Sequence, residues 1–287
     1  MNAHVMLAPR FVAAGALAVL LVASANAQTR RDEKHFGVEG KPVVVVQNPS
    51  GHLQIKAWDK HEVMVVGEHT DSIAVGTEQV GNRIEVAAQM TRPNASPADV
   101  KTNFEITVPT ETELRIRTDS GDVTVDSVHG DMSFDTVAAD LALQDVEGYV
   151  VIKSIGGSLV CTRCAGSLDA TSISGNFQMV QPSMDNVQVQ TSSGNILFDG
   201  SFLPRGIYVL KNYSGTIEVR FSNTDSFDVR AASLYGNVVN EAPVVPDRHQ
   251  MPAPHNTMAK SLFGTVNDGH AKVELSSFSG TIKILKR

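Results

Sequence analysis

The two cysteines are the residues of this chain that could most readily do redox or metal chemistry. Cys161 and Cys164 form a C-x-x-C pair, and the chain contains no other cysteine. A four-cysteine zinc site needs a second such pair, and a thioredoxin-like motif needs the pair to open a helix after a strand. Two interpretations stay open: the side chains are free thiols in the core, or they form a disulfide, which an exported protein permits.

Aspartates recur at short intervals in the middle of the chain and suggest a calcium site. Calcium-binding nonapeptide repeats read G-G-x-G-x-D-x-U-x, and their extra glycines let the backbone wrap around the ion. The repeats of this chain lack glycine at the second and fourth positions almost throughout. We therefore expect a solvated acidic face and no calcium site. The aspartates concerned are Asp122, Asp126, Asp131, Asp135, Asp140 and Asp145.

Enzyme chemistry on a β-helix is a second possibility. Polysaccharide lyases need clustered carboxylates for calcium and a basic residue that abstracts a proton. Lys153 and Arg163 lie in neighbouring repeats, but no carboxylate cluster of fixed spacing accompanies them, and the G-x-S-x-G elbow of serine hydrolases is absent. We predict no catalytic, cofactor-binding or metal-binding residue and keep a carbohydrate-active enzyme as the alternative.

A further group that could bind a metal lies in a proline-rich segment near the C-terminus. It consists of Asp247, His249 and His255, and the two histidines are six residues apart. Histidines in a loop of this kind are more often simply solvated, so we expect no metal there.

A nine-residue repeat predicts the strands and turns that hold most of these side chains. From Gly121 the segments read GDVTVDSVH, GDMSFDTVA, ADLALQDVE, GYVVIKSIG, GSLVCTRCA and GSLDATSIS. Positions three and five are apolar and alternate as in a half-buried strand, and the glycine at position one lets the backbone turn. We expect the apolar eighth residue to point inward as well, once the chain has turned a corner. The eighth positions are Val128, Val137, Val146, Ile155, Cys164 and Ile173.

Longer glycine spacings after Gly175 indicate how the nonapeptides combine. The next corresponding glycines are Gly194, Gly215 and Gly236, and each interval between them is close to two nonapeptides. The sequence therefore predicts an all-β, single-domain β-solenoid (parallel β-helix-like) of about 18–21 residues per coil. Stacked coils would lie about 4.8 Å apart, the strand spacing within a sheet. About eight coils would fill residues 118–287.

Residues 1–27 have the pattern of a secretory signal. A short apolar run covers 11–23, and Ala25-Asn26-Ala27 forms an A-x-A cleavage site before Gln28. We therefore predict an exported protein of the periplasm, the cell surface or the medium, with no transmembrane segment in the mature chain. The formal net charge of −7 argues against a nucleic-acid partner.

Composition divides the mature chain into two parts, the second of which contains a proline-rich loop. Residues 28–35 are expected to be a flexible N-terminus, and residues 36–287 to be the solenoid, with its most regular nonapeptides at 121–180. A proline-rich loop is expected at 241–258, because its four prolines cannot pair inside a sheet.

The recurrent segments resemble a known family of β-strand repeats. The stretch VVVVQNPSGHLQIKAWDKHEVMVV is similar to the opening of the DUF4097 or "putative adhesin" family of unknown function, and so are SGDVTV, SGNILF and SGTIEV. The resemblance covers residues 36–287 and implies a β-solenoid in an exported or envelope setting. It carries no catalytic residues. We expect a non-enzymatic module that binds a protein or glycan ligand, or one that is purely structural.

Overall fold

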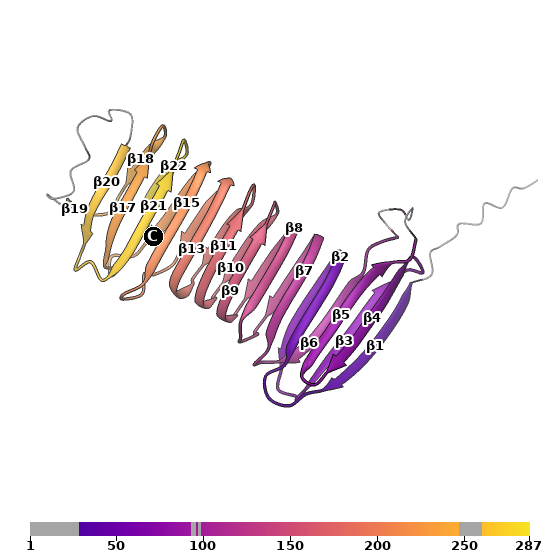
Figure 1. Cartoon of the computed structure of the whole chain (residues 1–287). Helices are drawn as coiled ribbons and strands as arrows, with labels where there is room; N and C mark the ends of the chain where they lie inside the picture. Colours follow the sequence, from indigo (N-terminus) through magenta and orange to yellow (C-terminus); the bar gives the residue numbers. More distant parts are fainter. Residues whose placement is uncertain (1–28, 93–95, 97–98, 247–259) are drawn as a thin grey trace, which may run out of the picture.

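Short strands stack in parallel along an elongated solenoid that has two β-faces (Figure 1). This computed structural model describes residues 29–92, 96, 99–246 and 260–287. Among these residues there is no helix, and hence none that could cross a membrane. The signal segment, the metal candidates Asp247, His249 and His255, and most of the proline-rich loop lie outside the described residues.

Each regular coil contributes one strand to each face. The first face contains β9 (Glu147–Ser154), β11 (Ala165–Ser172), β13 (Ser183–Ser193) and β15 (Ile207–Ser214). The second face contains β10 (Ser158–Thr162), β12 (Asn176–Val180), β14 (Ile196–Asp199) and β16 (Thr216–Phe221). Two longer strands, β7 (Glu113–Asp126) and β8 (Met132–Gln144), bend and belong to both faces. Apolar side chains that alternate along the strands of these coils fill the space between the two faces.

The parallel register gives the length of the coil directly. Val123 pairs with Leu141 and Leu141 with Leu159, so each of these coils consists of two nonapeptides. Farther along, Phe177 pairs with Ile196 and Ile196 with Ile217, so the coils there are slightly longer than two nonapeptides. The predicted β-solenoid and its coil length are therefore confirmed.

At the C-terminal end the order of coils in space differs from their order in the sequence. The last coil of the chain, β21 (Ala271–Ser277) and β22 (Thr281–Lys286), pairs with β15 and β16. The earlier coil, β17 (Phe227–Ser233) and β18 (Asn237–Asn240), lies beyond it. The antiparallel strand β20 (Lys260–Val266) pairs with β17, and β19 (Val245–Pro246) pairs with the other edge of β20. The C-terminal coil is thus inserted between two coils that precede it in the sequence.

At the other end the N-terminal segment continues the solenoid. β2 (Val43–Trp58) stacks on β7 in parallel, and β5 (Arg83–Met90) and β6 (Asn103–Pro109) pair with its two halves. β4 (Ile73–Val80) and β3 (Glu62–His69) add antiparallel strands outside these. The expectation that this part leads into the same solenoid therefore agrees with the strand pairing.

The expected flexible N-terminus at 28–35 is wrong for residues 30–35. These residues belong to β1 (Arg30–Gly37), an antiparallel edge strand that pairs with β3 along its whole length. Its side chains are nearly all exposed and five of its eight residues are Arg, Lys, Asp or Glu; Arg31 Nη1 lies 3.0 Å from Glu68 Oε1. Because the segment is charged, it lacks the apolar alternation from which strands are predicted. The charges also protect this sheet edge against pairing with another chain.

We expect the attachment of β1 to weaken as the pH rises through the titration of His35. Hydrogen bonds to the carboxylates of Glu33 and Glu62 raise the pKa of this imidazole above 6.5. The stabilisation is therefore fully present below pH 6.5 and is lost as the pH rises through the raised pKa. An NMR titration of the His35 ring should show a lower midpoint in Glu33→Gln/Glu62→Gln, whereas Glu78→Gln should leave it unchanged. Equal midpoints in all three proteins would contradict the assignment.

The two corners of the coil are different, and this corrects the prediction for position eight. Val128, Val146 and Cys164 are buried, but Val137, Ile155 and Ile173 are exposed. At the first kind of corner, position seven adopts a left-handed conformation and points outward, as in Asp145 (φ 51°) and Arg163 (φ 52°). At the second kind, position seven points inward, so position eight turns to the solvent. The true repeat unit is therefore a pair of nonapeptides with unlike corners.

The expected acidic face is also wrong. Asp122 and Asp140 lie on the second face, Asp135 lies on the first, and Asp145 lies at a corner. Successive nonapeptides run on opposite faces, so a residue type that recurs in every nonapeptide is divided between them. The aspartates therefore do not combine into one acidic surface.

Candidate functional site: an uncharged corner ridge

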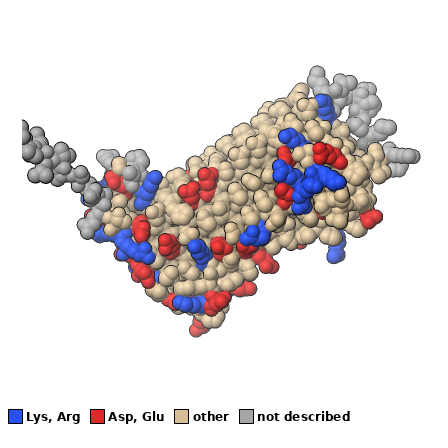
Figure 2. Space-filling model, turned by 180° about the vertical axis from the view of Figure 1, so that it is seen from behind, with Lys and Arg blue, Asp and Glu red and all other residues tan. Residues whose placement is uncertain are grey.

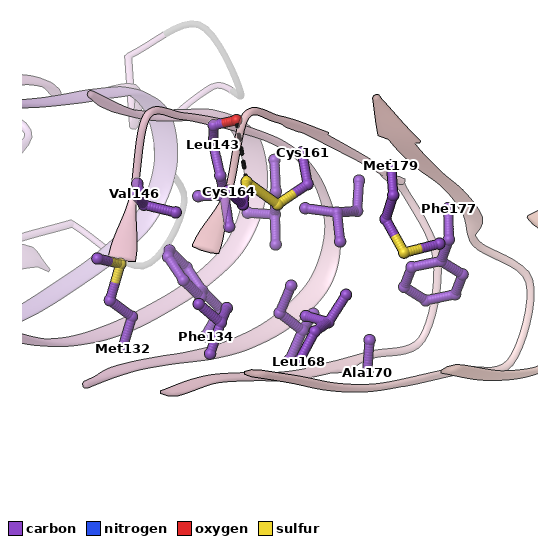
Figure 3. Close-up of a cluster of buried hydrophobic side chains, with 14 of the residues drawn as sticks. Met132, Phe134, Leu143, Val146, Cys161, Cys164, Leu168, Ala170, Phe177 and Met179 are labelled. Carbon is purple, nitrogen blue, oxygen red and sulfur yellow. Dashed lines mark hydrogen bonds between the residues drawn. A yellow bond between two sulfur atoms is a disulfide. The ribbon is translucent and has the colours of Figure 1, made fainter. Parts of the chain in front are cut away.

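The cysteine pair lies in the core at a corner of the first kind. The structure joins Cys161 and Cys164 in a disulfide with the two Cα atoms 6.0 Å apart, and both side chains are fully buried (Figure 3). Met179 and Leu143 are among the buried side chains around them (Figure 3). This position is closed to substrates and suits a structural bond.

We expect the mature protein to contain no reactive thiol and to lose about 2 kcal/mol of unfolding free energy on reduction, the loop-closure value for so short a loop. Thiol titration of the unfolded, unreduced protein tests the first point, and urea unfolding with and without a reductant tests the second. Cys161→Ala/Cys164→Val is the matched control, because other repeats carry Ala170 and Val146 at these positions. It should not respond to the reductant. Two reactive thiols in the unreduced wild type would favour free core cysteines.

The basic residues considered for lyase chemistry do not come together. Lys153 lies on the first face in β9. Arg163 lies at the corner after β10, where its guanidinium binds both carboxylate oxygens of Asp145 at 2.5 and 2.6 Å. That contact lowers the pKa of the Asp145 carboxyl. In the part of the chain that the structure describes, no three His, Cys, Asp or Glu side chains form a group that could hold a metal ion.

Corners of the second kind, except the one at Ala139, are built around a glycine that touches the neighbouring coil. A Cβ atom on Gly121 would lie 2.0 Å from the carbonyl oxygen of Gly51, and φ at Gly121 is 110°. The residue three positions before each of these glycines is Ser, Thr or Asn, and its side chain points inward. Ser172, for example, accepts a hydrogen bond from the backbone N–H of Gly175 at 2.9 Å. This inward polar residue forces the next side chain outward.

The outward side chains of successive corners form one line, which we call the corner ridge. Backbone hydrogen bonds set their order: Ser174 N donates to Ile155 O at 2.9 Å and Ser193 N to Ile173 O at 2.8 Å. Five steps of about 4.8 Å make the ridge about 24 Å long. Its members are Val137, Ile155, Ile173, Ser192, Tyr213 and Phe278.

The large side chains of the corner ridge are well exposed. The exposed fractions are 43% for Val137, 53% for Ile155, 57% for Ile173, 56% for Tyr213 and 37% for Phe278. Exposed apolar side chains are ordinary when scattered, but apolar side chains at five of six neighbouring corners indicate a contact surface. Because these apolar side chains are exposed, packing of the core does not explain why they stand in a row along the corner ridge.

The corner ridge also lacks charge. Its six corner segments read TVAA, SIGG, SISG, TSSG, NYSG and SFSG, with no acidic or basic residue among them. The ridge ends where the next corner, TDSG, places the exposed Asp119 beside Val137. Figure 2 shows a stretch of the upper long edge of the molecule without Lys, Arg, Asp or Glu. The opposite corners instead carry His129, Asp145, Glu147 and Arg163. A ligand on the ridge would therefore meet apolar surface and neutral polar groups.

A row of serine hydroxyls accompanies the apolar side chains. Ser174 Oγ lies 3.2 Å from Ile155 O, and Ser279 Oγ lies 3.2 Å from Tyr213 O. Ser174, Ser193 and Ser279 are exposed, so each oxygen keeps lone pairs for a ligand. The corner ridge thus combines apolar contact with neutral hydrogen-bonding groups along its length.

Aromatic rings occupy the C-terminal end of the corner ridge. The rings of Tyr213 and Phe278 are stacked, with centroids 4.4 Å apart and planes 10° from parallel. Tyr235 packs edge-on against Phe278 at 5.0 Å. The rings come from three coils that are neighbours in space but span residues 213–278 in the sequence. The inserted C-terminal coil is what places Phe278 between the two tyrosines.

This surface cannot be predicted from a repeat in which all nonapeptides are taken as equivalent. The sequence signal for it is a four-residue pattern with Ser, Thr or Asn three positions before the corner Gly or Ala. That pattern occurs in every second nonapeptide of the regular region, and it marks which of the eighth residues face outward.

The comparisons with known proteins agree with a repetitive all-β solenoid, and they place this chain in a family. The chain belongs to the Toastrack DUF4097 family, whose model matches residues 44–285. The family resemblance inferred from the sequence is thereby confirmed. No curated protein matches the sequence.

Two solved structures are similar to the chain. A "putative adhesin" from Bacteroides fragilis NCTC 9343 is 12% identical and covers 90% of this chain and 99% of its own, with a TM-score of 0.50. A "putative cell adhesion protein" from Clostridium sporogenes ATCC 15579 is 14% identical and covers 91% of this chain and 100% of its own, with a TM-score of 0.30. The first of these shows a shared fold.

Proposed function

We propose that this chain is an exported, non-enzymatic module of the cell envelope that binds a partner through its corner ridge. The observation that carries the proposal is the continuous row of exposed, uncharged side chains along one edge. A solenoid suits such a role, because its core is continuous and its surfaces are long. The adhesin label of the Bacteroides structure with the same fold points in the same direction.

Export is supported by the N-terminal pattern and is tested in the native cells. The mature protein should begin at Gln28 and appear in the periplasmic or surface fraction, and protease treatment of intact cells separates those two locations. Replacing Ala25 and Ala27 with leucine should leave an unprocessed precursor. A full-length protein in the cytoplasmic fraction would overturn the export part of the proposal.

Binding is tested with purified residues 28–287 and isolated envelope material. We expect saturable binding that Ile155→Asp/Ile173→Asp abolishes, because two carboxylates would have to be desolvated in the contact. Val160→Asp is the matched control, since Val160 is 38% exposed on β10, away from the ridge. Equal binding by both variants would show that the ridge is not the contact surface. Release of new sugar ends from the envelope material would instead indicate an enzyme.

A further inference from the structure

The corner ridge is interrupted at one coil by a small side chain. Ser192 stands in the row where its neighbours on either side are Ile173 and Tyr213. The coils of those two neighbours are two steps apart, which is about 10 Å. Ser192 is itself exposed. The row therefore has a gap at Ser192, and the large side chains of Ile173 and Tyr213 lie on the two sides of this gap.

The stacking of Tyr213 decides which way its free ring face points. Phe278 belongs to the connection between β21 and β22, on the side of β15 opposite to β13, and it covers one face of the Tyr213 ring at 4.4 Å. The other face is therefore directed toward the coil of Ser192. An aromatic face, a short hydroxyl side chain and the side chain of Ile173 follow one another along the ridge.

The chemistry of this position selects a class of ligand. The C–H groups on one side of a sugar ring pack well on the electron-rich face of an aromatic ring. The hydroxyls of Ser192 and Ser193, and that of Tyr213, provide neutral hydrogen-bonding groups at the edge of such a ring. The ridge has no cation for a phosphate or carboxylate, so an anionic polymer would find no partner for its charge.

We propose that the Ser192 position of the corner ridge seats one ring of an uncharged glycan, stacked on the free face of Tyr213. The chain of the glycan runs along the ridge and contacts Ile173 and Ile155 on one side. The inference rests on the proposed binding function and names the ligand class of the same surface.

The test measures binding of purified residues 28–287 to a fixed panel of soluble glycans by calorimetry. The neutral members are cellohexaose, chitohexaose, maltohexaose and yeast mannan, and the anionic members are polygalacturonate and heparin. We expect at least one neutral member to bind and the anionic members not to bind. Affinity should change less than about twofold between low and high salt, because no ion pair is formed.

Two pairs of variants locate the site. Tyr213→Ala should weaken binding at least about tenfold, which corresponds to about 1.4 kcal/mol, whereas Tyr149→Ala should leave it unchanged. Tyr149 is a matched control, because it is 46% exposed on β9, away from the ridge. Ser192→Phe should abolish binding by occupying the position with a ring that stacks on Tyr213, and Ser192→Ala should retain it. Circular dichroism of each variant confirms the fold.

The outcomes separate this inference from the broader proposal. Binding of envelope material without binding of any neutral glycan in the panel would overturn the inference and leave the proposed function standing. Binding of the anionic polymers alone would overturn it as well, as would wild-type affinity in Tyr213→Ala and Ser192→Phe. If the envelope material does not bind either, the proposed function fails together with the inference.

Discussion

Gly121→Ala is expected to destabilise the solenoid by about 3 kcal/mol or more, because two separate costs add at this position. A φ of 110° is a conformation that costs a residue with a side chain about 1–3 kcal/mol. The added Cβ would also lie 2.0 Å from the carbonyl oxygen of Gly51, and this is backbone of the adjacent coil. The strands can separate to relieve the clash only by stretching the hydrogen bonds between β2 and β7. Thermal unfolding should begin about 6–12 °C lower than in the wild type.

Gly37→Ala is the control for this prediction. Gly37 ends β1, has an ordinary φ, and has no atom within 4 Å of an added Cβ. Its substitution should change the free energy of unfolding by no more than about 1 kcal/mol. Equal effects at the two glycines would show that the contact between coils is not what requires glycine at the corner. Urea unfolding followed by circular dichroism measures both variants under the same conditions.

The architecture of the coil could be predicted because the core pattern is strictly local. Positions three and five of each nonapeptide face inward on both faces, and Val123, Leu141 and Leu159 accordingly stack in register. The corners could not be predicted from the same pattern. Whether position eight is buried depends on the conformation of position seven. A left-handed residue such as Asp145 points outward, so position eight is buried, whereas Ser172 points inward, so position eight is exposed.

The order of the coils at the C-terminal end could not be predicted either. The segments around Gly215, Gly236 and Gly280 have similar apolar patterns, so any two of them could pair with equally good burial. The antiparallel β20 decides the order, because it covers β17 and directs the chain back toward β15. The neighbouring rings of Tyr213 and Phe278 depend on this order and were hidden for the same reason.

The buried hydroxyl of Tyr208 lies where the connection between β14 and β15 packs on the core. The Tyr208 hydroxyl donates a hydrogen bond to Met184 O at 2.7 Å and accepts one from Leu203 N–H at 2.8 Å. Phe202 and Phe198 pack edge-on against the ring at 4.8 and 5.2 Å. Leu203 belongs to the long connection between β14 and β15, so this tyrosine fastens that connection to the core. Burial raises the pKa of Tyr208 to about 12.

Tyr208→Ala is expected to cost about 3–5 kcal/mol, the usual range for removing a buried aromatic ring. Tyr208→Phe keeps the ring and should cost about 1–3 kcal/mol, because a partly buried N–H and a buried C=O lose their partner. The stability difference between the wild type and Tyr208→Phe should be constant below pH 10 and decrease as the pH rises toward 12. The sign follows because the folded state holds the phenol proton more tightly than the unfolded chain. Urea unfolding at several pH values measures this difference, and an ultraviolet titration comparing the two proteins should show a phenol that ionises near pH 12 in the wild type only. A difference that does not change with pH would place the hydroxyl outside the core.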